Sequence, residues 1–350
     1  MRNYYNNEWL PTISASDFDK DDKKLATSVF SGCHNAVFWY LMISSIVFSI
    51  ITYGIAFFFP SSKVEVLIQD PLILYGMQIF AMYAVAFPIY CVLVRKIPKA
   101  EQREKSTVRF GEFLALFAIC LLMMQLGSYV SLIAKEYLSS RFALPSDLQM
   151  TYSLLAAGDV IPEILFAVIL APIFEELIFR KLMIDRLSIY GDRLAVIVSS
   201  IAFGLFHGNI TQLFFATMIG FVLGHIYTKT RRVSYTIVIH MLVNLFGTLP
   251  YVIYYLIYDE VLISTSVSVP MEGLGIAYNV FIIIHFALLV FGFVMLLVAL
   301  FAKKYRLSRL CDVEIPVTKF LGVVVLNKGT LLFFAYCVLN IVLTFLIVGQ

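Results

Sequence analysis

Long apolar stretches alternate with short polar connections along nearly the whole chain. A helix that crosses a bilayer needs about 20 mostly apolar residues. Stretches near this length lie at 36–59, 72–94, 111–134, 160–182, 193–207, 210–228, 234–256, 276–302 and 329–348. We therefore predict an all-α protein, a polytopic membrane helical bundle of about eight to nine transmembrane helices. Helices four to seven form its core, and the fifth is short and joined to the sixth almost without a loop.

The connections differ in their content of Lys and Arg in a regular way. Basic residues gather in the N-terminal tail and in every second connection, and the connections between these hold few or none. Because positive charge marks the cytoplasmic side, this alternation supports nine spans with a cytoplasmic N-terminus. The expected location is a plasma membrane, and the style of the motif region described below favours a bacterial one.

Composition agrees with a membrane protein. The chain has 350 residues, of which 61% are hydrophobic and 14% are charged, so it is far more apolar than a soluble domain. Its net charge of +3 gives no sign of a nucleic-acid partner. The five cysteines are scattered without a CxxC pair, so neither a disulfide framework nor a cysteine metal site is expected.

One apolar stretch carries charges that a bilayer does not tolerate without a reason. The sequence ILAPIFEELIFRKLM, residues 169–183, holds Glu175 and Glu176 side by side, followed by Arg180. Charged side chains within a membrane are costly and usually mark function. Glu176 and Arg180 are four residues apart and can pair on one helix face, whereas Glu175 lies about 100° round the helix and faces elsewhere. The structural alternative is an ion pair that locks helices together.

Two later helices add further polar groups at one-turn spacing. Phe203 and His207 share a face at the end of the short fifth helix, and His240 and Asn244 share a face on the seventh. The second pair suits either hydrogen bonding between helices or donation to a developing negative charge. Because these groups and the charged cluster come from about 70 residues, we expect them to form one site.

Small residues and a polar extension flank these groups. Ala216, Gly220 and Gly224 recur every four residues on the sixth helix, which predicts close packing of the short hairpin against the fourth helix. The stretch Lys181 to Asp192 reads as an amphipathic extension along the inner membrane surface.

The motifs EELIFR, FGLFH and HMLVN, in this order, resemble those of the CAAX-prenyl protease and bacteriocin-processing family, also called the CPBP or Abi family. The resemblance covers about residues 165–250 and implies an intramembrane glutamic endopeptidase. It implies that Glu175 and His207 activate water, that His240 and Asn244 hold the oxyanion, and that the remaining two matched residues shape and orient the site. Those two are Glu176 and Arg180. It implies neither a cofactor nor a metal.

The expected organisation follows from these motifs. Residues 1–35 form a cytoplasmic tail, 36–159 the N-terminal transmembrane helices, 160–256 the catalytic core and 257–350 the C-terminal transmembrane helices. The expected partners are a peptide or membrane-associated protein substrate and membrane lipid, and the sequence does not define an oligomer. The alternatives are a zinc-dependent membrane protease, a non-catalytic scaffold or bacteriocin-immunity protein, and a transporter, for which no inverted repeat is visible.

Overall fold

The structure is a computed structural model that describes residues 14–100, 104–142, 162, 164–258, 271–302 and 313–347. The regular elements of this part of the chain are helices, which confirms the predicted all-α bundle. In chain order they are α1 (Lys20–Phe58), α2 (Ser61–Gln69), α3 (Pro71–Ile79), η1 (Phe80–Ala86), α4 (Phe87–Arg95), α5 (Phe110–Phe142), η2 (Ile164–Leu170), α8 (Ala171–Glu176), η3 (Leu177–Ile184), α9 (Asp185–Leu187), η4 (Ser188–Tyr190), α10 (Asp192–Phe206), α11 (Ile210–Thr230), α12 (Val233–Tyr258), α14 (Met271–Phe301), α15 (Val317–Phe320), η5 (Leu321–Val325) and α16 (Lys328–Ile347).

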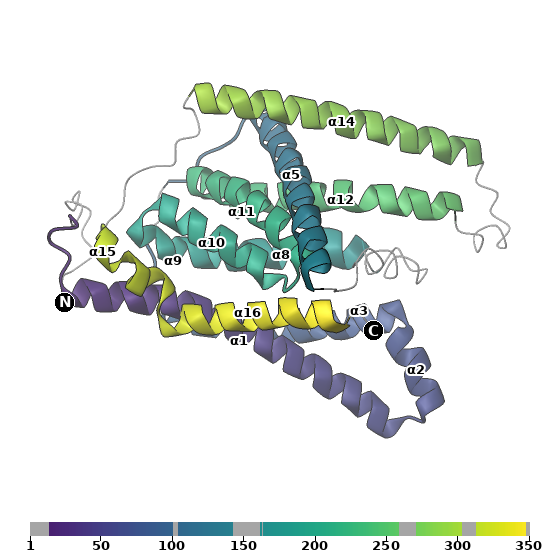
Figure 1. Ribbon diagram of the computed structural model, residues 1–350, viewed down its shortest axis with the longest axis horizontal. Helices are drawn as coiled ribbons and strands as arrows, with labels where there is room; N and C mark the ends of the chain where they lie inside the picture. The colour runs from purple at the N-terminus through teal and green to yellow at the C-terminus, as the bar shows by residue number, and fades with distance from the viewer. Residues whose placement is uncertain are drawn as a thin grey trace.

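The helices are arranged in layers (Figure 1). α14 lies along one side and contacts α5 and α12, while α5 crosses obliquely and packs against α11. α1 and α16 lie together along the opposite side. Between these outer helices lie α8, α10, α11 and α12, so the elements that carry the predicted motifs occupy the middle of the bundle.

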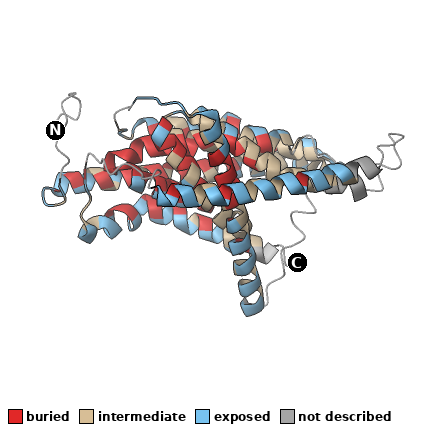
Figure 2. Ribbon diagram, turned by 90° about the horizontal axis from the view of Figure 1, so that it is seen from above, coloured by how far each residue is buried: buried red, intermediate tan, exposed pale blue. Residues whose placement is uncertain are grey.

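Burial follows the same arrangement. Figure 2 shows the buried residues gathered in the central helices and the exposed ones along the outer helices. Many exposed residues of the outer helices are large and apolar, among them Phe57 on α1, Ile283 on α14 and Val338 on α16. Apolar side chains directed outwards are expected where the surrounding solvent is lipid.

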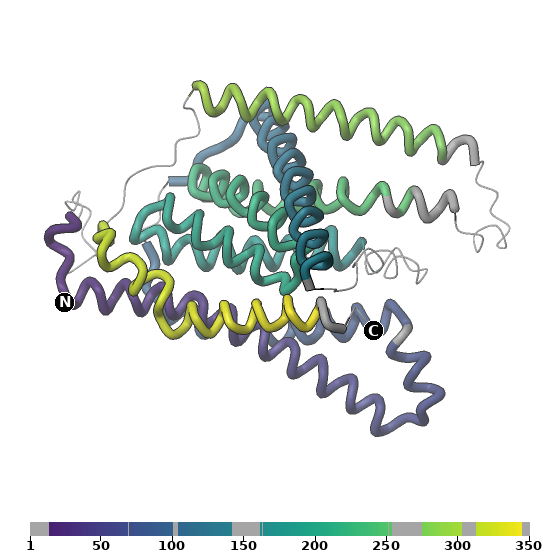
Figure 3. The backbone as a smooth tube through the Cα atoms, viewed as in Figure 1, coloured from purple at the N-terminus to yellow at the C-terminus, as the bar shows by residue number. Residues whose placement is uncertain are grey.

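Six helices of the described residues are long and apolar enough to cross a membrane, and a bent pair makes seven if it forms one span. That pair, 317–325 with 328–344, is bent by 58° and runs beside α1 (Figure 3). The remaining two predicted spans are also helical. The part of 160–182 from residue 164 onwards lies in the run of π- and α-helical segments from η2 to η3, and 193–207 becomes the short, 15-residue α10. The chain is thus a multi-pass membrane protein.

α1 begins at Lys20, within the predicted tail and ahead of the predicted span 36–59, because Asp19 caps it by accepting hydrogen bonds from the Asp21 and Asp22 amides. One sequence-based expectation differs from the structure. The stretch Lys181 to Asp192 does not lie on the surface, because most of it is buried within the bundle. The buried Tyr227 hydroxyl donates a hydrogen bond to the Asp185 carboxylate at 2.7 Å. Asp185 thus has a partner inside the protein, whereas an amphipathic surface helix would have exposed its charge to water.

Small residues bring α10 and α11 into close contact. A Cβ atom added at Gly220 would lie 3.1 Å from the Ser200 Cα of α10, and one at Gly224 would meet Val196 of α10 first and Ile184 of η3 second. The predicted stripe therefore packs mainly within the hairpin and only partly against the helix run that carries the glutamates. On the other side, Gly204 of α10 lies against the Leu213 carbonyl and the Thr217 side chain of α11.

We predict that Gly204→Ala destabilises the protein, because the new methyl group would overlap a backbone carbonyl of α11. Overpacking of this kind costs about 1–3 kcal/mol, so the unfolding temperature in detergent should fall. The matched control is Gly76→Ala on α3, where a Cβ meets no other atom within 4 Å and should leave the unfolding temperature unchanged or slightly raised. Equal unfolding temperatures for the two variants would contradict the proposed packing.

Candidate active site

The two adjacent glutamates lie on a short α-helix between two π-helical segments. α8 ends at Glu176, with η2 before it and η3 after it. Carbonyls of η3 accept side-chain hydrogen bonds: Ser199 of α10 donates to Phe179 O at 2.9 Å, and Tyr90 of α4 donates to Ile178 O at 3.3 Å. π-Helical turns are rare and frequent at functional sites. These hydrogen bonds fix the run that carries the carboxylates against two neighbouring helices.

Glu176 is the centre of a fully buried charge cluster. Its Oε2 lies 3.0 Å from Arg180 Nε, and both side chains have no exposed surface. Its Oε1 lies 3.0 Å from His240 Nδ1 of α12. The predicted pairing of Glu176 with Arg180 is therefore confirmed, and the partner from α12 joins it. A buried carboxylate with two such partners is stabilised in its charged form.

Arg180 is held by charge and by an aromatic face rather than by aligned hydrogen bonds. Its guanidinium carbon lies 4.6 Å from the centre of the Phe203 ring of α10, a cation–π contact. None of its three side-chain nitrogens makes a hydrogen bond of good geometry to another described residue. The contact with Glu176 is thus mainly electrostatic, and the Phe203 ring links the cation to α10.

His240 contacts both glutamates. While Nδ1 meets Glu176, Nε2 lies 3.8 Å from Glu175 Oε2. Glu175 therefore does not face away from the cluster, because the two nitrogens of one imidazole reach carboxylates that differ by about 100° round the helix. The two carboxylates differ in access: the Glu175 side chain is 13% exposed, whereas that of Glu176 is 0% exposed.

His207 is held by the tight turn between α10 and α11. Its Nδ1 lies 2.8 Å from Phe203 O, and its own carbonyl accepts a hydrogen bond from Asn209 Nδ2 at 2.9 Å. Gly208 takes a positive φ of 64°, a conformation that favours glycine. The Asn209 side chain then caps α11 by accepting from the Gln212 amide at 2.8 Å. The local sequence thus fixes the backbone on both sides of His207.

This turn brings His207 next to the cluster. The predicted packing of Phe203 beside His207 is confirmed, with ring centres 5.1 Å apart, and the same ring lies 5.7 Å from His240. His207 also lies close enough to Glu175 and His240 to interact electrostatically with both. Phe203 is therefore the common neighbour of the imidazoles and of Arg180.

Asn244 lies at the edge of the site. Its Nδ2 donates to Ala167 O of η2 at 2.8 Å, which uses one of the two amide hydrogens. This bond ties α12 to the start of the run that carries the glutamates. The structure thus brings all the predicted site residues into one region, from the run η2–α8–η3, from the end of α10 and from α12.

Sequence analysis missed two tyrosines that border this site. Tyr40 of α1 and Tyr83 of η1 both interact electrostatically with Glu175. Aromatic residues are common in apolar spans, so no local signal separates these tyrosines from packing residues. The N-terminal helices therefore contribute side chains to the surroundings of Glu175 as well as spans.

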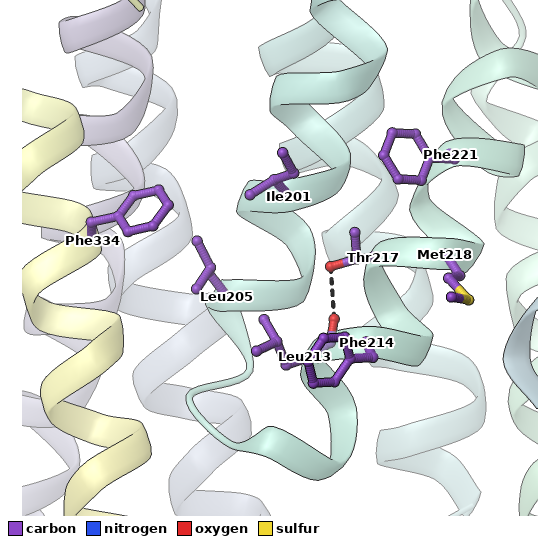
Figure 4. Close-up of a pocket in the computed structure, with 8 residues that line it drawn as sticks. All are labelled: Ile201, Leu205, Leu213, Phe214, Thr217, Met218, Phe221 and Phe334. Carbon is purple, nitrogen blue, oxygen red and sulfur yellow. Dashed lines mark hydrogen bonds between the residues drawn. The ribbon is translucent and has the colours of Figure 1, made fainter. Parts of the chain in front are cut away.

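Neither a metal-binding group nor the apolar cavity coincides with the site. Among the described residues, no three His, Cys, Asp or Glu side chains are grouped so that they could hold a metal ion. A cavity of about 310 Å³ lies between α10, α11 and α16, and its lining is almost wholly apolar (Figure 4). Its lining residues include Leu205, Phe214 and Phe334 but none of the charged cluster. Its position and chemistry suit hydrocarbon rather than a reaction.

Comparison with known proteins agrees with this location. Residues 157–246 match the family model described as "Type II CAAX prenyl endopeptidase Rce1-like". Over 218 residues the chain is 23% identical to the Bacillus subtilis (strain 168) protein named "Putative membrane peptidase YdiL", a match that covers 60% of this chain and 86% of the relative. No solved structure matches the chain.

The matched segment contains every residue of the cluster and of the two histidine motifs. Together the fold and these matches define a membrane protein with a protease-type core. Residues 157–246 are thus similar to the type II CAAX prenyl endopeptidase (Rce1-like) family, and a membrane protease is the general class of function that the matches support.

We predict that the two neighbouring glutamates differ in their effect on stability. Glu176→Gln removes the charge that faces buried Arg180, and breaking a buried pair in this way costs about 3–5 kcal/mol. Its unfolding temperature in detergent should therefore fall well below that of the wild-type protein. Glu175→Gln is the matched control and should unfold near the wild-type temperature. The carboxylate that it removes is partly exposed, and its distance to the imidazole of His240 is 3.8 Å. Equal losses in both variants would contradict the structural role of Glu176.

Proposed function

We propose that the protein is an intramembrane endopeptidase that hydrolyses a peptide bond in a membrane-associated peptide or protein by activation of water. The observation that carries the proposal is the difference between the two adjacent carboxylates. Glu176 is fully buried and engaged with Arg180 and His240, whereas Glu175 keeps accessible surface within the same cluster. In this proposal Glu176 holds the site together, and Glu175 is the carboxylate that reacts.

In this mechanism Glu175 is the general base. It takes a proton from a water molecule while the water oxygen attacks the carbonyl carbon of the substrate, and His207 helps to orient that water. The carbonyl electrons move to its oxygen, which forms a tetrahedral oxyanion. Glu175 then returns the proton to the leaving amine as the C–N bond breaks, so the proton balance closes. Proton transfer by a positioned side chain contributes roughly 100- to 10,000-fold to a rate.

The oxyanion is assigned to His240 and Asn244. The Asn244 amide has one hydrogen bonded to Ala167 O and a second available for a ligand. His240 is oriented by Glu176 through Nδ1, which leaves Nε2 on the side of Glu175. Removal of one such donor typically lowers kcat by about 100-fold or more.

Arg180 and Glu176 are assigned the role of positioning the other residues of the site. Their contact fixes the charge that orients His240, and the Phe203 ring against Arg180 also contacts His207. Substrates of the CAAX type or of the leader and bacteriocin type both suit a membrane-embedded site. The membrane peptidase name of the Bacillus subtilis relative supports a peptide as substrate.

We predict that Glu175→Gln and His207→Ala abolish proteolysis. Each change removes a group assigned to water activation, so the rate of product formation should fall by roughly 100-fold or more. The measurement is a comparison, by mass spectrometry, of membrane-associated peptides from cells that express wild-type or variant protein. Products present with the wild type should be missing with either variant.

The control for this comparison is His225→Ala on α11, a histidine that lies outside the cluster. Its product pattern should match that of the wild type. If Glu175→Gln and His207→Ala are expressed at wild-type levels and give the wild-type peptide pattern and phenotype, the protein acts as a scaffold or immunity factor instead.

A second prediction separates direct water activation from zinc chemistry. Because no three potential ligands among the described residues are grouped for a metal, purified protein in liposomes should keep its activity on a cellular product precursor after treatment with a zinc chelator. Loss of activity with chelator and its recovery on addition of zinc would favour the zinc-dependent alternative.

A further inference from the structure

Two tyrosines of the N-terminal helices contact the residues that immediately precede Glu175 and His207, the two groups proposed to activate water. The Tyr83 ring stacks on Phe174, the neighbour of Glu175, with ring centres 3.9 Å apart and planes inclined by 6°. The Tyr40 ring stacks on Phe206, the neighbour of His207, with ring centres 5.8 Å apart. Both tyrosines lie outside the segment 157–246 that matches the family model. The N-terminal helices therefore position both halves of the pair.

The Tyr83 hydroxyl is unsatisfied although it is buried. Tyr83 is 8% exposed, and its hydroxyl has no hydrogen-bond partner among the described residues. A buried hydroxyl without a partner is costly, and such groups are usually satisfied by a bound water or ligand. Tyr90, one helix further along the chain, shows the contrast, because its hydroxyl donates to Ile178 O at 3.3 Å.

The surroundings of Tyr83 identify the partner of this hydroxyl. Glu175 and Tyr40 both lie near enough to Tyr83 to interact with it electrostatically, yet neither forms a hydrogen bond with its hydroxyl. Polar groups at such a separation are typically bridged by water. A water needs two to four polar partners to be held in a protein interior, and a carboxylate together with one or two phenols supplies them.

We propose that the Tyr83 hydroxyl and the Glu175 carboxylate hold one water molecule between them, so that Tyr83 is a positioning residue for the hydrolytic water. The water donates one hydrogen to Glu175 and accepts one from Tyr83. One lone pair then remains for attack on the carbonyl carbon, and the second water hydrogen is free to meet His207 or Tyr40. The catalytic meaning of this water rests on the proposed function, whereas the shared water itself does not.

Infrared spectroscopy of the full-length protein in liposomes tests the shared water without a substrate. The carboxylate bands of Glu175 are identified by subtraction of the Glu175→Gln spectrum. Tyr83→Phe keeps the ring on Phe174 and removes only the hydroxyl, so it should shift these bands, because hydrogen bonding to a carboxylate changes its stretching frequencies. The matched control, Tyr190→Phe, removes the hydroxyl of another buried tyrosine, which lies on η4 and packs on Phe30 of α1, and should leave them in place. Bands that coincide in Tyr83→Phe and wild-type protein would overturn the inference.

A reciprocal measurement covers the case in which Tyr83→Phe does not fold. In protein with labelled tyrosine, Glu175→Gln should shift a phenol C–O band of the wild-type spectrum, since the two groups share one water. An unchanged set of tyrosine bands would equally overturn the inference. Unfolding temperatures in detergent identify any variant whose fold is lost.

Activity then separates this inference from the proposed function. The rate at which cells accumulate the peptides that the wild type produces should fall roughly 10- to 100-fold in Tyr83→Phe, as for loss of a hydrogen bond to a charged site. It should stay near wild type in Tyr190→Phe. With purified protein and one such precursor, kcat should fall while KM stays nearly constant, a split that a merely structural role does not produce. Wild-type activity of Glu175→Gln would overturn the proposed function and leave the infrared result to decide on the water. Loss of activity in Glu175→Gln alone, with wild-type kcat in Tyr83→Phe, would overturn the positioning role of Tyr83.

Discussion

The fully buried contact between Glu176 and Arg180 is the constraint on which the rest of the site depends. Charges without exposed surface must be neutralised by neighbours, since the cost of burying each one alone is several kcal/mol. Two long-range partners meet this need: His240 brings α12 to the carboxylate, and the ring of Phe203 brings α10 to the guanidinium. The ion pair therefore determines which helices meet, and it does so in a part of the bundle where apolar packing alone is weakly specific.

This arrangement divides the work between two neighbouring carboxylates. Glu176 is engaged in structural contacts. Glu175 stays accessible, because it lies farther from His240 than Glu176 does and has no close cation beside it. The π-helical segments on both sides of α8 contribute to this difference. Carbonyls of η3 accept hydrogen bonds from side chains of α4 and α10, and a carbonyl of η2 accepts one from α12, and these bonds keep the run from rotating. The fixed carboxylate of Glu176 thus holds the neighbouring, more accessible carboxylate of Glu175 at a defined place inside the bundle.

Local patterns in the sequence predicted the parts that depend on helical periodicity. The apolar spans, the pairing of Glu176 with Arg180 and the contact of Phe203 with His207 all follow from spacing along one helix, and each is present. The contact of His240 with both glutamates and the neighbourhood of Tyr83 could not be predicted, because they join elements about 60 to 90 residues apart by packing that periodicity does not encode. The buried course of the stretch 181–192 was missed for the same reason, since its charges find partners on distant helices.

The turn that carries His207 has one more neighbour, and it comes from the last described helix. Thr344 of α16 donates to the Gly208 carbonyl at 3.4 Å, and a Cβ at Gly208 would lie 3.2 Å from Asn340. Membrane proteins are made and inserted from the N-terminus onwards, so this contact forms only after residues 328–347 have entered the bilayer. During synthesis the turn that carries His207 therefore lacks this contact until the last described helix is in place.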